Sequence, residues 1–323
     1  MLKRFLSIWM LCGCLLGATA QERVKFVVFA DLHYDLMPDG GQRLADILGA
    51  AAKQQADFVV DLGDFVPASA RYDSVRRQVA NAAVPVYHTL GNHDLDLTDK
   101  QTYAAYWGMP APYYYFDRGK FRFIVLDSNF FVDKDGQTKP YDRHNYGRVG
   151  EEARNRYGEE QLGWLEKLLA DTTRICVLFS HAPVNDGYAE VVQNRAVHQL
   201  LTDARNRGTR VAMVFGGHIH SDNYHCIDGI HYLQVNGASY IWGGSKFTTT
   251  ARYPDAVHRA YPSLKYVIPY DRALFATVEL DDKGKIRIKG TKGRYVKPEP
   301  DKALLKTKSY PCSPIISSLK LRY

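Results

Sequence analysis

Residues 24–33 read Val-Lys-Phe-Val-Val-Phe-Ala-Asp-Leu-His, an apolar run that ends in two polar side chains. Because valine and phenylalanine favour extended structure, the run predicts a buried strand over 24–30. Asp31 and His33 follow it directly and are separated by Leu32. Alternate residues of an extended strand share a face, so the spacing predicts that Asp31 and His33 point the same way while Leu32 turns inward.

Four more polar groups follow apolar runs in the same manner. They are Gly63-Asp64 after 58–62, Gly91-Asn92-His93-Asp94 after 84–90, His181 after 175–180, and Gly216-Gly217-His218-Ile219-His220 after 211–215. Open α/β sheets bind ligands beyond the carboxyl ends of their strands, so we expect the five groups to meet. Each group has a purely structural explanation when taken alone, such as a helix cap for Asp64 or a turn at Gly91-Asn92. Their common position at strand ends favours a shared site.

The rest of the chain alternates between strand and helix patterns. Further strands are predicted at 121–127, 231–235 and 274–280, and helices at 43–54, 71–82, 159–169 and 194–207. This alternation predicts an α/β domain whose helices cover a largely central sheet. Two stretches without regular periodicity, 129–157 and 239–270, are interpreted as long surface loops with a functional role. We therefore divide the mature chain into one domain over 21–290 and a C-terminal tail over 291–323 that packs irregularly on it.

The N-terminal residues 1–20 resemble a secretory signal peptide. Lys3-Arg4 precedes an apolar run, and Ala18-Thr19-Ala20 is typical of a cleavage site. We expect an exported protein, periplasmic or secreted, whose mature chain begins at Gln21. An alternative interpretation makes Cys14 the anchored first residue of a lipoprotein. No later stretch offers the roughly 20 apolar residues that a membrane helix needs.

The chain carries a formal net charge of +7. Its basic residues are partly concentrated in 283–295, where they alternate with apolar ones, a pattern that favours a solvated edge strand over a nucleic-acid surface. We therefore expect no nucleic-acid polymer as a partner. Beyond the signal peptide the cysteines are Cys176, Cys226 and Cys312, which have no metal-binding spacing. Cys176 is predicted to be a buried thiol, and a Cys226–Cys312 disulfide is left as an alternative.

The strand-end groups together supply seven candidate metal ligands: Asp31, His33, Asp64, Asn92, His181, His218 and His220. Mixed carboxylate, amide and imidazole ligands suit manganese, iron or zinc and disfavour an all-oxygen calcium site. Seven ligands exceed the four of a tetrahedral zinc site. Two divalent ions that share a carboxylate are the economical solution, and such a pair can hold both oxygens of an in-line phosphoryl displacement.

In this order, the motifs Asp-x-His, Gly-Asp, Gly-Asn-His-Asp, a single His and Gly-His-x-His resemble those of the calcineurin-like metallophosphoesterase superfamily, which includes purple acid phosphatase-like proteins. The resemblance covers residues 31–220. It implies a four-layer α/β/β/α sandwich with two central mixed sheets flanked by helices. It also implies that Asp64 bridges two ions, of which manganese is favoured, with Asp31, His33 and His220 completing the first and Asn92, His181 and His218 the second. The chain departs from the family at Phe65-Val66-Pro67, which affects loop shape more than ligation.

The same resemblance gives a catalytic role to His93, which follows Asn92 but is not itself a ligand. His93 is expected to act as general acid toward the leaving group, with Asp94 orienting its imidazole. A metal-bridging hydroxide is expected to attack phosphorus in line. The residues thus imply a metal-dependent phosphoesterase that acts on a small phosphorylated substrate.

Substrate-binding residues are less constrained by the sequence. Asn92 and His93 are candidates from the resemblance, and Asn236 is a candidate because it follows a predicted strand. The neighbouring aromatic residues are Tyr240, Trp242 and Tyr253. Aromatic faces favour stacking on a base or sugar, so a small phosphodiester or a nucleotide is the favoured substrate. Alternatives are a phosphomonoesterase at the same site and a non-catalytic metal-binding module, although the complete ligand set argues against the latter.

Overall fold

The computed structural model describes residues 21–185 and 195–323. The signal peptide expected at 1–20, with the alternative anchor Cys14, lies outside the described residues, and so does Asn194 at the start of a predicted helix. Within the two described ranges, no helix has the length and apolar character needed to cross a bilayer.

The first of two large sheets contains the strand that opens the chain. Its strands are β1 (Arg23–Phe29), β2 (Phe58–Asp61), β3 (Val86–His88), β14 (Ala276–Asp281), β15 (Lys285–Gly290) and β16 (Leu319–Arg322), in the order β16-β15-β14-β1-β2-β3. β1, β2 and β3 run parallel, whereas β14 pairs with β1 in antiparallel register. The sheet is therefore mixed, and the carboxyl ends of its parallel strands lie along one edge.

The second sheet is also mixed. Its strands are β4 (Tyr114–Arg118), β5 (Phe121–Val125), β8 (Ile175–Phe179), β9 (Arg210–Gly216), β10 (Asn223–Ile227) and β11 (Ile230–Gln234), in the order β10-β11-β9-β8-β5-β4. The central strands β5, β8, β9 and β11 are parallel, and the two outer strands are antiparallel to their neighbours. Buried parallel strands need apolar side chains on both faces, which explains the unbroken apolar run in β8.

The two sheets pack face to face through aromatic side chains. Phe26 of β1 lies 5.7–5.9 Å, centroid to centroid, from the rings of three phenylalanines in the second sheet, all in edge-to-face geometry: Phe123, Phe179 and Phe215. Each such contact adds about 0.5–1.5 kcal/mol to the burial of apolar area. The aromatic layer therefore stabilises the packing of the two sheets against each other.

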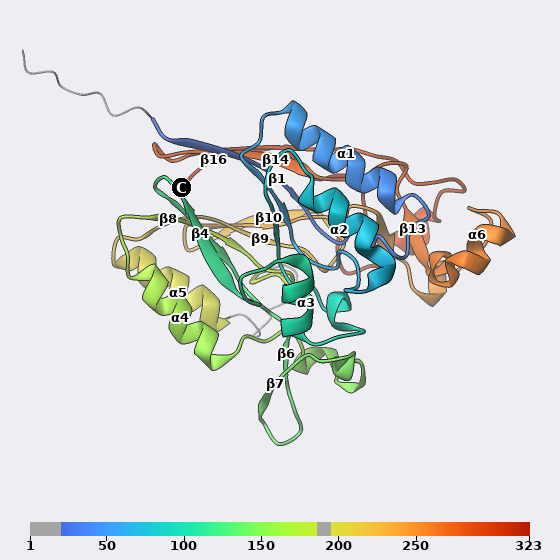
Figure 1. The fold of residues 1–323 in the computed structure, drawn as a ribbon, viewed down its shortest axis with the longest axis horizontal. Coiled ribbons are helices and arrows are strands. Elements are labelled where there is room, and N and C mark those ends of the chain that lie inside the picture. The colour runs from blue at the N-terminus through green and yellow to red at the C-terminus, as the bar shows by residue number, and fades with distance from the viewer. Residues whose placement is uncertain (1–20, 186–194) are drawn as a thin grey trace, which may run out of the picture.

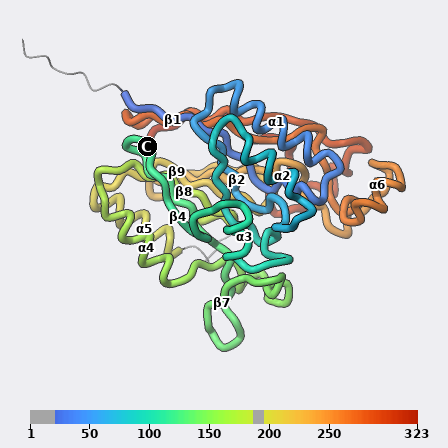
Figure 2. The backbone as a smooth tube through the Cα atoms, in the orientation of Figure 1, coloured from blue at the N-terminus to red at the C-terminus, as the bar shows by residue number. Residues whose placement is uncertain are grey.

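Helices cover the outer face of each sheet (Figures 1 and 2). α1 (Gly40–Lys53) and α2 (Asp73–Ala80) pack on the first sheet, and α4 (Glu159–Leu169) and α5 (Arg195–Asn206) pack on the second. The predicted four-layer α/β/β/α sandwich is confirmed. A further helix, α3 (Lys100–Trp107), was not expected, although Asp99 caps its first turn through Thr102 and Gly108 ends it at a φ of 71°.

The two stretches predicted to be loops contain short regular elements. Residues 129–157 form a hairpin of β6 (Phe130–Val132) and β7 (Thr138–Pro140), which projects from the body in Figure 1, and two 3₁₀ turns (Asn145–Arg148 and Glu151–Ala153). Residues 239–270 form β12 (Tyr240–Trp242), the helix α6 (Asp255–Ala260) and β13 (Val267–Pro269). These elements are too short for periodicity to reveal them.

The C-terminal segment is more regular than predicted. After the short helix α7 (Lys302–Leu305), β16 pairs with β15 and so becomes the edge strand of the first sheet. In the segment between α7 and β16, Ile315 forms an isolated β-bridge with Lys292. Residues 291–323 therefore form part of the sandwich as well as packing on its surface.

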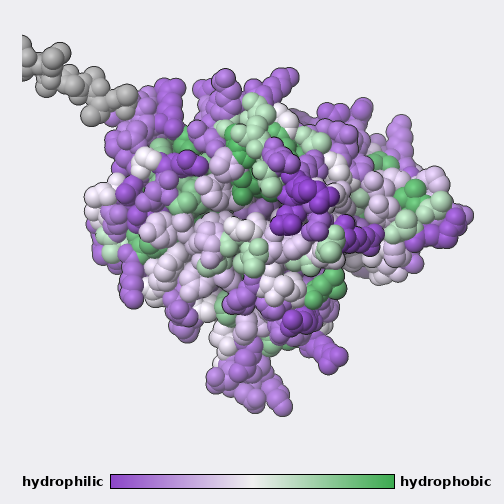
Figure 3. Space-filling view, viewed as in Figure 1, coloured by the Kyte–Doolittle hydropathy of each residue, from purple (hydrophilic) through white to green (hydrophobic). Residues whose placement is uncertain are grey.

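The three described cysteines are free thiols. Cys176 is buried, as predicted, while Cys226 is exposed and Cys312 is half-buried. The alternative Cys226–Cys312 disulfide is therefore not formed. The face shown in Figure 3 is mainly hydrophilic, with hydrophobic residues only in small patches.

Candidate metal centre

The strand ends bring the predicted ligands together at one edge of the sandwich. Six of them fall into two groups, within each of which one ligand atom per residue lies within 4.8 Å of the others: Asp31, His33 and His220 in the first, and Asp64, His181 and His218 in the second. Asn92 adjoins the second group, because its Oδ1 lies 3.1 Å from His181 Nε2. The same division into two sets of three around Asp64 follows from the sequence resemblance.

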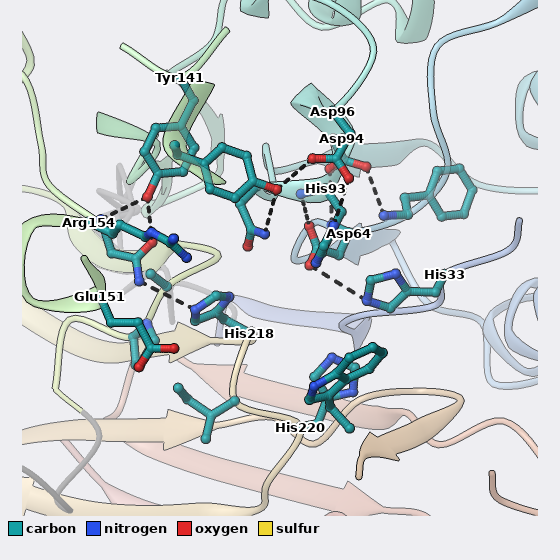
Figure 4. A pocket seen from close by; sticks show the side chains of 18 of the residues that line it. His33, Asp64, His93, Asp94, Asp96, Tyr141, Glu151, Arg154, His218 and His220 are labelled. Atoms are coloured by element: carbon teal, nitrogen blue, oxygen red, sulfur yellow. Dashed lines mark hydrogen bonds and ion pairs between the residues drawn. The ribbon is translucent and has the colours of Figure 1, made fainter. Parts of the chain in front are cut away.

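Asp64 belongs to the second group, but its carboxylate also faces the first. Its Oδ2 is 3.6 Å from His33 Nε2 in the first group and 3.3 Å from His181 Nε2 in the second. Figure 4 shows the Asp64 carboxylate in the middle of the site, with His33 on one side and His218 on the other. This is the position that a bridging carboxylate must occupy.

The backbone of the ligand loops differs from the extended geometry that we expected. Five ligand residues have positive φ, namely Asp31 (51°), His33 (44°), Asp64 (55°), His218 (72°) and His220 (53°). The side chains lie as predicted, since Asp31 and His33 share one ligand group and Leu32 is buried. The extended backbone expected at the strand ends is wrong. A left-handed turn costs a non-glycine residue about 1–3 kcal/mol, and such strain gathers at functional sites where the surroundings enforce it.

Backbone hydrogen bonds hold these strained loops side by side. The Asp31 N–H donates to the Gly63 carbonyl and the His33 N–H to the Asp64 carbonyl, both over 3.0 Å. The Asp31 carboxylate also accepts the N–H of His218, with Oδ2 at 3.0 Å, and so joins the two sheets. The ligand positions are therefore fixed by the protein itself.

Two glycines allow the loops after β2 and β3 to touch. Gly63 has a φ of 97°, and a Cβ on it would lie 2.5 Å from the backbone N of Gly91. A Cβ on Gly91 would in turn overlap the backbone N and the carboxylate of Asp64. A side chain at Gly63 would displace the Gly91 backbone or the His181 ring, and one at Gly91 would displace the Asp64 carboxylate.

Carbonyl groups fix the orientation of two ligand imidazoles. His181 Nδ1 lies 2.9 Å from the Leu62 carbonyl oxygen, and His220 Nδ1 lies 2.8 Å from that of Tyr240. A carbonyl oxygen only accepts, so Nδ1 carries the proton in both rings and Nε2 is left to bind a metal. His33 Nε2 is buried and has no hydrogen-bond partner, as expected for an atom that serves as a ligand.

The pKa values of the candidate ligands bear on metal binding. Burial holds the pKa of His33 well below its usual value, and burial together with the charge of His181 lowers that of His218 to about 3, so both imidazoles are neutral. Burial opposes ionisation of Asp64, but His181 and His93 outweigh it and hold its pKa well below the usual range. Burial likewise disfavours the charge on His181, yet the Asp64 carboxylate raises its pKa to about 10, so a cation bound at Nε2 would displace a proton from it. The donor set and the orphaned His33 nitrogen thus fit two divalent cations.

His93 stands beside the ligands, but its partner is not the one predicted. Its Nδ1 lies 2.8 Å from Asp96 Oδ2, three residues further along the same turn. Asp94 is buried beneath the turn and accepts the backbone N–H groups of Gly91, Asp64 and Phe65 at 2.8–3.0 Å. The expectation that Asp94 orients His93 is therefore wrong. Asp94 instead ties the loops after β2 and β3 together, and Asp96 orients the imidazole.

The sequence reasoning missed the residues that surround Asp96. Its Oδ1 accepts the Tyr146 hydroxyl at 2.6 Å and lies 2.7 Å from His144 Nδ1, both from the 129–157 segment. The spacing of His93 and Asp96 on one short turn was a usable local signal. No local signal exists for His144 and Tyr146, because their contacts span 48 and 50 residues.

Asn236 does not take the substrate-binding role that we expected. It is fully buried, its Nδ2 donates to the carbonyls of Ser313 and Ile315 at 2.7 and 3.0 Å, and its Oδ1 accepts the Tyr270 hydroxyl at 2.9 Å. Its amide therefore fastens the C-terminal segment to the domain. A strand-end position alone does not tell whether a polar side chain faces the site or the core.

A pocket of about 1490 Å³ is lined by His93 and by five of the seven candidate ligands, all except the fully buried Asp31 and His181. Of the three aromatic candidates, Tyr240 and Trp242 line it and Tyr253 does not. Tyr240 is buried and stacks on His220 at 4.8 Å, whereas the Trp242 side chain is 45% exposed. Arg154, Asn155 and Tyr310 are among the lining residues that come from neither strand ends nor ligand loops.

The fold is shared with a solved structure. A dimetal phosphatase from Danio rerio is 18% identical, with a TM-score of 0.57 over 86% of this chain and 98% of the other. The Plasmodium protein GAP50, an anchor in the inner membrane complex, is 14% identical, with a TM-score of 0.48 over 85% of each chain. No curated protein sequence matches the chain significantly.

A family comparison goes beyond the fold. The profile of the calcineurin-like phosphoesterase family matches residues 24–222, which contain all seven candidate ligands and His93. This match extends over more than half of the chain. The chain therefore belongs to the calcineurin-like phosphoesterase family and is a metal-dependent phosphoesterase.

Proposed function

We propose that the protein hydrolyses a small phosphodiester or a nucleotide at this centre, with two manganese ions as its metals and His93 as the general acid. The observation that carries the proposal is the placement of Asp64 between two ligand triads, in a pocket that also contains His93. Asp31, His33, Asp64 and His220 would hold one ion, and Asp64, Asn92, His181 and His218 the other. Two such ions supply Lewis acidity toward the phosphoryl oxygens and activate water as the nucleophile.

His93 has the properties of a proton donor. Its side chain is half exposed to the pocket, and Asp96 holds the Nδ1 side of the ring. Burial opposes protonation, but the charge of Asp64 and the hydrogen bond to Asp96 raise the pKa of His93 to about 9. The contact with Asp96, which is not a candidate ligand, favours the protonated imidazole, which can donate to a departing alkoxide and contribute about 10² to 10⁴ in rate.

The size of the pocket favours a substrate with a second substantial group. Ligand sites are commonly about 300–1,000 Å³, and this pocket, at about 1490 Å³, is larger than a phosphate monoester of a small alcohol requires. Trp242 and Tyr310 offer aromatic surface in it, and Arg154 offers a cation. Aromatic surface suits a base or an aryl group, and a guanidinium suits a second anionic group.

A turnover screen tests the proposal. The manganese-loaded protein is assayed against an aryl phosphate, the matching bis-aryl phosphate and a panel of nucleotides. We expect kcat/KM to be highest for the diester or a nucleotide, and Trp242→Ala to raise KM for that substrate more than for the aryl monoester. A clear preference for the monoester would favour a phosphomonoesterase. Failure on every substrate would favour a non-catalytic module.

We also propose that the protein is exported, because Lys3-Arg4, the apolar run and Ala18-Thr19-Ala20 form a signal-peptide pattern. N-terminal sequencing and mass spectrometry of the protein from the producing cells test this. A chain that begins at Gln21 supports cleavage of a signal peptide. A lipid-modified Cys14 at the N-terminus supports the anchored alternative, and an intact Met1 contradicts export.

A further inference from the structure

The Asp96 carboxylate is the meeting point of three side chains from two distant segments. Oδ2 contacts His93 Nδ1 at 2.8 Å, while Oδ1 contacts His144 Nδ1 at 2.7 Å and the Tyr146 hydroxyl at 2.6 Å. Both oxygens are thus engaged, and the carboxylate cannot rotate without breaking a contact. Burial alone would raise the pKa of Asp96, but the hydrogen bonds from His93, Tyr146 and His144 lower it and keep the group ionised.

The segment that carries His144 and Tyr146 is docked on the turn of His93. The His144 N–H donates to the Leu95 carbonyl at 3.1 Å, and the Arg143 N–H donates to the Thr98 carbonyl at 3.3 Å. Because Leu95 directly precedes Asp96, the docking places the His144 ring beside that carboxylate. The backbone therefore brings the two segments together independently of the His144 side chain.

The local backbone is distorted to present His144. Arg143 and His144 have φ values of 42° and 60°, a conformation that few non-glycine residues adopt. Gly147 makes room for the ring, since a Cβ there would overlap His144 Nε2. Strain of this kind persists where the surrounding structure enforces it, which is typical of functional sites.

We propose that His144 and Tyr146 are positioning residues of the acid machinery, which hold Asp96 so that His93 faces the leaving group. The inference rests on the proposed function of His93 and extends it to the 129–157 segment. Tyr146 also accepts a hydrogen bond from Asn92 Nδ2 at 3.2 Å, so its hydroxyl connects the acid to a metal-ligand loop. His144 is the cleaner test because no contact to a candidate ligand complicates its replacement.

Two replacements of His144 separate the hydrogen bond from the ring. Asparagine and glycine both tolerate a positive φ, so neither adds backbone strain. His144→Asn keeps an N–H donor near the place of Nδ1, whereas His144→Gly removes it. Arg143→Asn is the matched control, because Arg143 has the same backbone strain but its side chain contacts Asp99 and Asp142 and not Asp96.

The assay compares an alkyl phosphate ester with a nitrophenyl ester on the manganese-loaded enzyme. An alkoxide needs a proton to leave and nitrophenolate does not, so only the first substrate depends on the acid. We expect His144→Gly to lower kcat on the alkyl ester about tenfold, the lower end of the effect of residues that hydrogen-bond to active-site groups. KM and the rate on the nitrophenyl ester should be unchanged. His144→Asn should recover most of the loss, and Arg143→Asn should match the wild type.

Three results would overturn the inference. They are full kcat of His144→Gly on the alkyl ester, an equal loss of rate on both substrates, and a His144→Asn variant as slow as His144→Gly. A second readout, the proton NMR signal of His93 Nδ1 in the zinc-loaded protein, does not depend on turnover. The signal should be present in the wild type and in His144→Asn. In His144→Gly it should be lost by fast exchange. If the wild type hydrolyses neither ester, the proposed function fails, while this signal still decides whether His144 positions His93.

Discussion

Asp94→Ala removes a buried carboxylate from beneath the metal centre without touching a ligand. In the native protein that carboxylate accepts three backbone N–H groups, from Gly91, Asp64 and Phe65. The first two belong to the loops that present Asn92 and Asp64. We expect the variant to lose both stability and metal affinity, because the donors are left unpaired and the bridging carboxylate is no longer held in place.

The size of the effect follows from two opposing contributions. Each buried N–H that loses its acceptor costs about 1–3 kcal/mol, so three of them cost at least about 3 kcal/mol. Against this, burial and the charges of Asp64 and Asp61 raise the pKa of Asp94 well above its usual value, so removing the charge relieves some repulsion. We expect a net loss of about 3 kcal/mol for Asp94→Ala. Asp94→Asn keeps one acceptor oxygen and loses the charge, so its loss should be about 1 kcal/mol.

Urea unfolding in the presence of a chelator measures the stability without the contribution of bound metal. Asp96→Ala is the matched control, since Asp96 lies in the same turn but contacts only side chains and is 29% exposed. It should lower the free energy of unfolding by less than Asp94→Ala does, about 1–2 kcal/mol, because the half-exposed rings of His93 and His144 can reach water whereas buried backbone N–H groups cannot. On an alkyl ester, however, it should lower kcat about 10- to 100-fold, within the range of general-acid catalysis.

The reasoning would be refuted if Asp94→Ala and Asp96→Ala lost equal stability. It would also be refuted if Asp94→Ala bound metal normally and lost only the turnover of unactivated esters, since that is the behaviour of a residue that orients His93. Such a result would restore the role that the sequence alone suggested for Asp94.

Four further outcomes are expected. Metal analysis of protein loaded with manganese should approach two ions per chain, and a single tightly held ion would contradict the two-group arrangement. His93→Ala should keep both ions and lose most turnover of an alkyl ester, while normal turnover would remove its role as acid. Lys100→Met should lower the free energy of unfolding in urea by about 3–5 kcal/mol, because it leaves the buried Asp127 carboxylate, 2.5 Å away, without its partner. The double variant Lys100→Met/Asp127→Asn should regain much of this loss. Alkylation of the native protein should modify the exposed Cys226 and spare Cys176, whose pKa burial raises to about 12; rapid modification of Cys176 would show that β8 is not buried.

Much of the site was readable from the sequence because its signals are local. An apolar run followed by Asp31-Leu32-His33 or Gly63-Asp64 specifies a strand and the polar end of that strand within ten residues. Five such groups in a fixed order limit the chemistry to divalent metals, and the residue types select borderline ions. The alternation of strands with helices indicated an α/β domain in the same way, because periodicity is a property of neighbouring residues, whereas the two-sheet sandwich followed from the family resemblance.

Local patterns gave the wrong geometry where the backbone leaves its regular form. The strand ends bend into left-handed conformations at Asp31, His33, Asp64, His218 and His220, because backbone contacts between adjacent loops enforce them. The choice between Asp94 and Asp96 was likewise invisible, since both lie near His93 in sequence. Only the packing of Asp94 against the backbone of Gly91 and Asp64 assigns it to the scaffold.

The sequence by itself determined the layers, the ligand types, their order and hence the class of reaction. The tertiary structure alone decided which carboxylate holds His93, that Asn236 fastens the C-terminal segment, and that His144 and Tyr146 reach Asp96 across 48 and 50 residues. The physical reason is the range of each interaction. Strand and helix patterns come from neighbours along the chain, whereas a hydrogen bond between loops depends on how the two sheets pack.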